Sequence, residues 1–191
     1  MKKIIDNEFS LHKETLLRLS SNTAQIEEAA KNIISKLESG GKILLFGNGG
    51  SAADAQHIAA ELVGRYKKNR VSIPAIALTT DTSIITSISN DFGYDLLFSR
   101  QIQALASDND VAIGITTSGN SKNVLNGLIL AKENGCYCIG LTGSNDSSLL
   151  NCTDLVLSVP SDNTPRVQEM HILIGHILCE LVDCHFSIET Q

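Results

Sequence analysis

The first part of the chain carries apolar residues at helical spacing. This spacing predicts two helices within residues 7–39. Asn22 and Gln25 resemble a capping pair at the start of the second helix, and Gly40-Gly41 marks its end. The residues that recur on one face of the second helix are Ile26, Ala29, Ala30, Ile33, Ile34 and Leu37.

Beyond Gly41, short apolar runs alternate with amphipathic segments. The apolar runs predict five buried strands, at 42–47, 74–79, 110–116, 136–143 and 154–160. The segments between them predict helices at 51–67, 82–89, 94–106, 121–134, 145–151 and, from Thr164-Pro165 to about His185, at the end of the chain. Strands that alternate with helices in this way predict a parallel sheet covered on both faces.

We therefore expect an α/β fold: a five-stranded parallel sheet flanked by helices, with an N-terminal helical pair. A length of 191 residues fits one domain and is enough to bury a core. The expected domain covers residues 1–191, with helices in 1–40 and an αβα sandwich in 41–191. The N-terminal pair either caps the sheet or packs against another subunit.

The charge and composition of the chain limit the classes of partner that it can bind. The net charge of −6 argues against a nucleic-acid groove, which needs a basic face. A phosphorylated small molecule remains possible, because main-chain N–H groups bind phosphate. The opening residues carry charges where a signal peptide is apolar, and no apolar run approaches the ~20 residues that span a bilayer. We expect a cytoplasmic protein without a membrane or nucleic-acid partner.

The cysteines do not indicate a metal site. Their number is odd and none shows the C-x-x-C spacing of zinc sites. The expectation is reduced, buried thiols, with Cys136 and Cys138 on one side of a strand. The other cysteines are Cys152, Cys179 and Cys184.

Two polar turns follow predicted strands, in "LLFGNGGSAADAQH" at 44–57 and "AIGITTSGNSKNV" at 112–124. In a parallel sheet, ligands bind beyond the carboxyl ends of the strands. Hydroxyl groups, a close-approaching Gly119 and the N-terminus of a helix can bind an anion without lysine. A simpler interpretation is that Ser121 only caps the following helix. "GNGGS" lacks the G-x-G-x-x-G spacing and the P-loop lysine, which argues against dinucleotides and ATP.

Potential acid–base residues lie beside these turns. His57 and Glu61 are four residues apart and share one helix face next to the first turn. On the last helix, Gln168, His171 and His176 are candidates, and a buried core histidine is the simpler interpretation of a histidine in this apolar segment. A surface hydrogen bond explains a His–Glu pair equally well when it stands alone.

Four blocks of sequence resemble the sugar isomerase (SIS) domain family, and within it the phosphoheptose isomerases. They are "GNGGSAADAQHIAAEL", "SNDFGYDLLFSRQI", "TTSGNSKNV" and "PRVQEMHILIGHIL", and they span nearly the whole chain. The resemblance implies an aldose–ketose isomerase that converts sedoheptulose 7-phosphate to D-glycero-D-manno-heptose 7-phosphate through an enediol, for the heptose of lipopolysaccharide or capsule. Such chemistry needs a base placed over the C–H bond. It also needs an acid or base at the two oxygens and stabilisation of the negative charge that develops on them.

The resemblance also assigns residues. It implies Glu61 as the base and His176 as the acid or second base. It implies a divalent metal, zinc in some members and expected once per subunit, on His57, Glu61, Gln168 and His176. Substrate contacts carry over to Asn48, Gly49, Gly50, Ser51, Glu61, Asn90, Asp91, Thr116, Thr117, Ser118, Ser121 and Gln168. The segment of Asn90 and Asp91 has a simpler interpretation as a turn.

One geometric constraint concerns the metal. Gln168 and His176 are eight residues apart, so an unbroken helix separates them by about 12 Å. Metal bonds are only ~2 Å long. We therefore expect a site that combines residues of more than one chain, in the homo-oligomer, commonly a tetramer, that the resemblance implies. The alternative is that the apolar last helix is the central helix of a monomer.

Two other functions stay open. One is a non-catalytic SIS protein of the type that associates with the DnaA initiator, and the other is an isomerase of another sugar phosphate. Retention of both Glu61 and His176 favours an enzyme. Pro165 occupies a position that is acidic in some phosphoheptose isomerases. The sequence therefore predicts phosphate binding better than it predicts which sugar hydroxyl groups the protein recognises.

Overall fold

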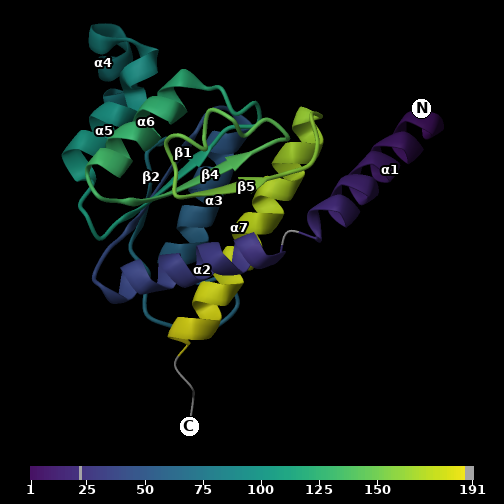
Figure 1. Ribbon diagram of the computed structural model, residues 1–191, viewed down its shortest axis with the longest axis horizontal. Helices are drawn as coiled ribbons and strands as arrows, with labels where there is room; N and C mark the ends of the chain where they lie inside the picture. The colour runs from purple at the N-terminus through teal and green to yellow at the C-terminus, as the bar shows by residue number, and fades with distance from the viewer. Residues whose placement is uncertain (22, 188–191) are drawn as a thin grey trace.

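The computed structural model describes residues 1–21 and 23–187, and its elements follow the predicted order (Figure 1). The helices are α1 (Lys2–Leu19), α2 (Thr23–Glu38), α3 (Gly50–Val63), α4 (Thr82–Phe92), the 3₁₀ turn η1 (Tyr94–Leu96), α5 (Leu97–Leu105), α6 (Lys122–Glu133) and α7 (Thr164–Phe186). The strands are β1 (Ile43–Gly47), β2 (Ala75–Ala77), β3 (Val111–Ile115), β4 (Tyr137–Thr142) and β5 (Leu155–Ser158).

Two predicted boundaries need correction, and a third prediction is not tested. Helix α1 already begins at Lys2. Residues 2–9 are all exposed, so they show no pattern of buried apolar positions from which a helix could be predicted. Helix α3 ends at Val63 rather than at 67, with Gly64 at its C-cap. The predicted capping residue Asn22 lies outside the described residues.

The short helix predicted at 145–151 is wrong. The N–H groups of Leu149 and Leu150 both bond to the carbonyl of Asp146, and the N–H of Cys152 bonds to Leu149. These are consecutive turns rather than a continuous α-helical ladder, so the segment from 147 to 152 is a run of turns. Its apolar residues Leu149 and Cys152 are nevertheless buried, which is what made the segment resemble an amphipathic helix.

The sheet is parallel throughout, in the order β2-β1-β3-β4-β5, as the alternating pattern predicted. The chain passes from β1 outward to β2 and then returns to the other side of β1 for β3. Gly47 is in register with Ile115, so β1 and β3 end side by side. This reversal of strand order makes the space beyond Gly47 and Ile115 the natural ligand crevice of the sheet.

Alternate residues of each strand pack against opposite layers of helices. In β1, Ile43 and Leu45 join the core beneath α2, α3 and α7, whereas Leu44 and Phe46 join the core beneath α5 and α6. The central strands β1 and β3 are buried along their whole length. Burial on both faces explains why these strands are continuous apolar runs rather than alternating ones.

Helix α1 projects away from the sheet and contacts the body through α7 (Figure 1). His12 Nδ1 lies 2.7 Å from Glu169 Oε2, and Arg166 donates to the carbonyl of Glu8 at 2.7 Å. Its apolar residues Ile4 and Phe9 are 67% and 72% exposed in the isolated chain. The sequence expectation of a helix that packs against another subunit therefore stays a prediction.

The cysteines agree with the prediction at four of five positions. Cys136, Cys138, Cys152 and Cys179 are buried, and Cys136 and Cys138 belong to the same core. Burial raises the pKa of the Cys138 thiol to about 12, so this group is unreactive. Cys184 is exposed, contrary to the expectation of burial, because it follows Asp183 on the outer side of the last turns of α7. In the described part of the chain, no helix has the length and apolarity to cross a bilayer.

Candidate active site

The first polar turn begins where β1 ends and leads directly into α3. Gly49 has a φ of 57°, a conformation that favours glycine. A Cβ at Gly50 would lie 2.5 Å from Nε2 of Gln168, so glycine lets the Gln168 amide from α7 approach the first turn of α3. Ser51, the next predicted contact, is buried. The glycines of "GNGGS" therefore allow a tight turn against which the side chain of Gln168 on α7 packs.

The side chain of Asn48 connects this turn to α6. Asn48 and Asn123 exchange two side-chain hydrogen bonds, each of 2.9 Å, and Asn123 is buried. The hydroxyl of Tyr94 donates to Asn48 Oδ1, also at 2.9 Å. Because Asn123 lies in the first turn of α6, this amide pair fixes the two polar turns relative to each other.

The second turn gathers hydroxyl groups beyond the end of β3. Thr116 Oγ1 lies 2.9 Å from Ser121 Oγ and 3.5 Å from Ser118 Oγ. Ser121 is at the N-cap position of α6, yet among the described residues its hydroxyl pairs with Thr116 rather than with a main-chain N–H of the helix. The simpler interpretation, in which Ser121 only caps α6, is therefore wrong for this arrangement.

Gly119 holds the second turn against the following loop. Its φ is 71°, and a Cβ there would lie 2.1 Å from the carbonyl oxygen of Asn145. That carbonyl accepts a hydrogen bond from Thr142 Oγ1 at 2.9 Å, which fixes its position. Only glycine fits, so the turn is rigid and presents Ser118 and the start of α6 to the crevice.

Three potential acid–base groups converge from two helices. His57 Nε2 lies 3.3 Å from Glu61 Oε1 on α3 and 3.4 Å from His176 Nε2 on α7. One ligand atom of each residue lies within 4.8 Å of the other two. The side chains of His57 and Glu61 are 49% and 26% exposed, so the cluster is open to a ligand. The prediction that His57, Glu61 and His176 meet is confirmed.

The spacing of this cluster suits a metal ion. Tetrahedral coordination with bonds of about 2.1 Å places neighbouring ligand atoms roughly 3.4 Å apart. The two distances from His57 Nε2, 3.3 and 3.4 Å, agree with that spacing. Two imidazoles and one carboxylate also form a donor set typical of zinc with an open coordination position. Two of the three separations therefore match tetrahedral coordination, and the three ligand atoms lie within 4.8 Å of one another, so these residues could hold a divalent cation.

Asp54 precedes His57 by one helical turn on α3. Burial raises the pKa of its carboxyl group to about 6, and the nearby His57 lowers that pKa in part. Asp54 Oδ2 is buried and finds no hydrogen-bond partner among the described residues. Burial without a partner disfavours the charged form, so Asp54 takes up a proton at a higher pH than an ordinary aspartate.

The remaining predicted residues lie in two places. Gln168 packs on Gly50, eight residues along α7 from His176, so within one chain it lies toward the glycine turn. Asn90 and Asp91 lie on the last turn of α4 and hydrogen bond to each other at 2.7 Å. They belong to a helix end rather than to a simple turn. Tyr94, which contacts Asn48, brings this segment beside the first polar turn.

His171 has the core role that the sequence predicted. It is fully buried and its Nε2 lies 3.1 Å from the carbonyl of Thr142. Burial lowers its pKa to about 4, against a smaller opposite effect of that hydrogen bond. A neutral, enclosed imidazole does not exchange protons with a ligand near pH 7. His171 is therefore not a candidate for acid–base chemistry, unlike His176 in the cluster.

Sequence reasoning missed three residues of the site. Asn123 and Tyr94 lie in the quoted sequence blocks, but nothing in their spacing indicated that they meet Asn48. Tyr66 stacks its ring on that of His176, with the ring centroids 5.2 Å apart and an angle of 19°. Tyr66 lies beyond the end of α3, in a segment that the helical prediction had extended to 67. Only the tertiary arrangement reveals these three contacts.

Comparison with known proteins identifies relatives of this arrangement. The model of the SIS domain matches residues 10–143. The phosphoheptose isomerase of Aliarcobacter butzleri is 53% identical over 98% of this chain and 100% of its own length, and that of Aquifex aeolicus is 57% identical over 83% of both. The structure of a phosphoheptose isomerase from Neisseria gonorrhoeae has a TM-score of 0.91 and 39% identity, and covers 96% of this chain and 98% of that one.

Proposed function

The chain belongs to the phosphoheptose isomerases of the SIS-domain family, and we infer that it converts sedoheptulose 7-phosphate to D-glycero-D-manno-heptose 7-phosphate. It is a sugar-phosphate isomerase that acts in heptose biosynthesis. The observation that carries the mechanism below is the convergence of Glu61, His57 and His176 from α3 and α7, the two helices that meet at the first polar turn through Gly50 and Gln168.

We assign the phosphate to the turn at 116–121. Its hydroxyl groups, among them that of the exposed Ser118, and the electropositive start of α6 together suit a dianion. Charge-assisted hydrogen bonds contribute about 1.5–3 kcal/mol each, more than the ~0.3–1 kcal/mol of the helix dipole. We propose that the remaining predicted contacts bind the sugar: Asn48, Gly49, Gly50, Ser51, Asn90, Asp91, Thr117 and Gln168.

Proton transfer is assigned to Glu61. Its Oε1 faces His57, so Oε2 is the oxygen that we assign to take the proton from C1 of the ketose. The same carboxyl group returns a proton to C2 and so forms the aldose. Meanwhile a proton moves between the oxygens on C1 and C2. We assign this transfer to His176 in the metal-free cluster; with a metal bound, His176 is a ligand instead. A carboxylate and an imidazole on opposite sides of an enediol suffice for aldose–ketose exchange.

We propose that the metal is zinc, held by His57, Glu61 and His176, with Gln168 as a fourth ligand. When bound, such a cation stabilises negative charge on the enediolate oxygens. Gln168 is too far along α7 to join His176 on one ion, at about 12 Å. We therefore propose that a neighbouring subunit supplies it, within a homotetramer. The exposed apolar residues of α1 support an additional subunit contact.

Metal content tests this assignment without reference to activity. We expect about one zinc per subunit in purified protein by elemental analysis, and less than one tenth of that in His57→Ala. As a control, His185→Ala removes an exposed histidine that contacts Glu38 and should leave the zinc content unchanged. Equal zinc in all three proteins would reject the site. Because a ligating Nε2 carries no proton, the zinc content also decides between the two roles of His176.

We further propose a cytoplasmic location and a product that enters lipopolysaccharide or capsule heptose. The buried free thiols support a reducing compartment.

A direct assay tests the proposed reaction. We expect the purified, zinc-loaded protein to convert sedoheptulose 7-phosphate to the aldose, observed by NMR of the anomeric protons. Fructose 6-phosphate, a ketose phosphate one carbon shorter, serves as the comparison substrate. Turnover of the heptose alone supports the proposal, and preference for the hexose indicates a different sugar-phosphate isomerase. No turnover of either sugar would favour the non-catalytic type of SIS protein.

A further inference from the structure

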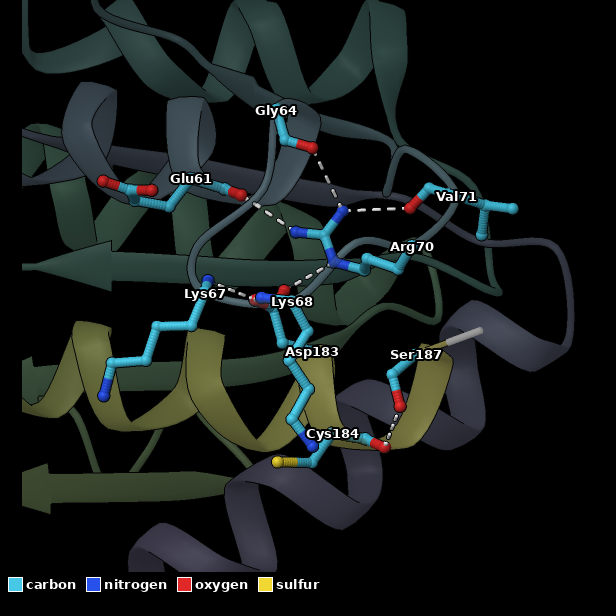
Figure 2. A network of polar contacts seen from close by, with 9 residues as sticks. All are labelled: Glu61, Gly64, Lys67, Lys68, Arg70, Val71, Asp183, Cys184 and Ser187. Carbon is cyan, nitrogen blue, oxygen red and sulfur yellow. Dashed lines mark hydrogen bonds and ion pairs between the residues drawn. The ribbon is translucent and has the colours of Figure 1, made fainter. Parts of the chain in front are cut away.

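A buried ion pair lies directly behind the acid–base cluster. Arg70, in the segment between α3 and β2, donates from Nε to Asp183 Oδ1 on α7 at 2.6 Å (Figure 2). Both side chains are almost completely inaccessible, with exposures of 0% and 1%. Breaking such a pair leaves a buried charge, so it is a strong constraint on the segments that it joins.

The guanidinium of Arg70 also holds the end of α3. Its second terminal nitrogen donates to the main-chain carbonyl of Glu61 at 2.9 Å (Figure 2). Helix α3 ends two residues later, so this carbonyl is among those that lack a partner within the helix. Arg70 supplies that partner and places a positive charge at the helix C-terminus, where it is favourable. The main chain that carries Glu61 is thereby fixed.

The carboxylate of Asp183 holds the segment that carries Tyr66. Its Oδ2 accepts hydrogen bonds from the N–H groups of Lys67 and Lys68, at 2.6 and 3.0 Å (Figure 2). These N–H groups follow Tyr66 directly, and the Tyr66 ring stacks on His176. Burial alone would raise the pKa of Asp183, but these hydrogen bonds and Arg70 lower it overall, which keeps the carboxylate charged.

We propose that Arg70 and Asp183 are positioning residues for the isomerase reaction, which hold the main chain of Glu61 and the ring of Tyr66 against His176. Asp183 lies seven residues after His176, two turns along the same side of α7. One ion pair therefore links the helix of the base to the helix of the imidazole. Displacements of about 1 Å in such a site lower rates by ~10²-fold. The inference rests on the proposed function.

Arg70→Lys tests the proposal because lysine keeps the charge but lacks the fork that reaches Glu61. We expect kcat to fall about 10–100-fold with KM for sedoheptulose 7-phosphate changed less than threefold, since the hydrogen-bond partners of Arg70 are Asp183, Gly64, Val71 and Glu61 and do not belong to the phosphate turn. The affinity for Zn²⁺ alone, measured by competition with a chelator, should weaken about 10–100-fold.

A matched control comes from the same two segments. Lys67 Nζ and Glu180 form an exposed ion pair of 2.7 Å between the loop and α7. Glu180→Gln removes that pair and should leave kcat, KM and Zn²⁺ affinity unchanged. If folded Arg70→Lys behaves like Glu180→Gln, the positioning role is rejected and the buried pair is only structural.

Two further comparisons keep the result decisive. If Arg70→Lys does not fold, Tyr66→Leu replaces it: removal of the stacked ring should lower kcat about tenfold at constant KM, and an unchanged kcat would overturn the proposal. If the unaltered protein does not turn over sedoheptulose 7-phosphate, the proposed function fails. The Zn²⁺ affinities of the same variants then still decide whether Arg70 positions the cluster.

Discussion

Replacing Glu61 by glutamine is expected to lower kcat about 10³-fold while the binding of sedoheptulose 7-phosphate stays within threefold of the unaltered protein. Glutamine has nearly the same shape and keeps an oxygen for the contact with His57, which is 3.3 Å in the unaltered protein. Its amide cannot accept a proton from carbon at neutral pH. The steady-state rate and a calorimetric titration with the sugar phosphate measure the two quantities separately.

Glu133→Gln is the matched control for this experiment. Glu133 is exposed at the end of α6, so the same chemical change there should leave both quantities unaltered. Full activity in Glu61→Gln would reject Glu61 as the base. A raised KM with an unchanged kcat would instead show that Glu61 binds the ground state and the transition state equally.

The alternation of strands and helices made the fold predictable from sequence. Strands buried on both faces are apolar throughout, so β1 and β3 stood out as runs between polar segments. The parallel order followed, because helices that alternate with strands must cross over the sheet. The prediction failed where burial gave no pattern, as in the exposed start of α1, and where buried residues belong to turns, as at Leu149.

The candidate site was predictable to the extent that it is local. His57 and Glu61 lie one turn apart on a helix, so their contact follows from spacing alone. The contact of His57 with His176 spans 119 residues and came only from family resemblance. Arg70 was missed altogether, since an arginine in a polar loop gives no sign of burial. Its partner Asp183 lies in an apolar helix, where a buried charge that requires a partner was a usable signal.

The phosphate turn gives the second large expected effect. The double substitution of Ser118 and Ser121 by alanine should raise KM for sedoheptulose 7-phosphate about 10²-fold or more, with kcat within threefold. Each lost hydrogen bond to a charged group costs about 1.5–3 kcal/mol, or a factor of roughly ten to one hundred in affinity. Initial rates over a wide range of substrate concentration give both constants.

Unphosphorylated sedoheptulose distinguishes a phosphate site from a general loss of structure. If residues 116–121 bind the phosphate, the double variant and the unaltered protein should process this sugar at the same low kcat/KM, because neither hydroxyl then has a charged partner. Ser147→Ala, an exposed serine of the neighbouring loop, should leave both substrates unaffected. An unchanged KM for the phosphorylated sugar in the double variant would place the phosphate elsewhere. It would also remove the reason for assigning the substrate phosphate to the hydroxyl-bearing turn beyond β3.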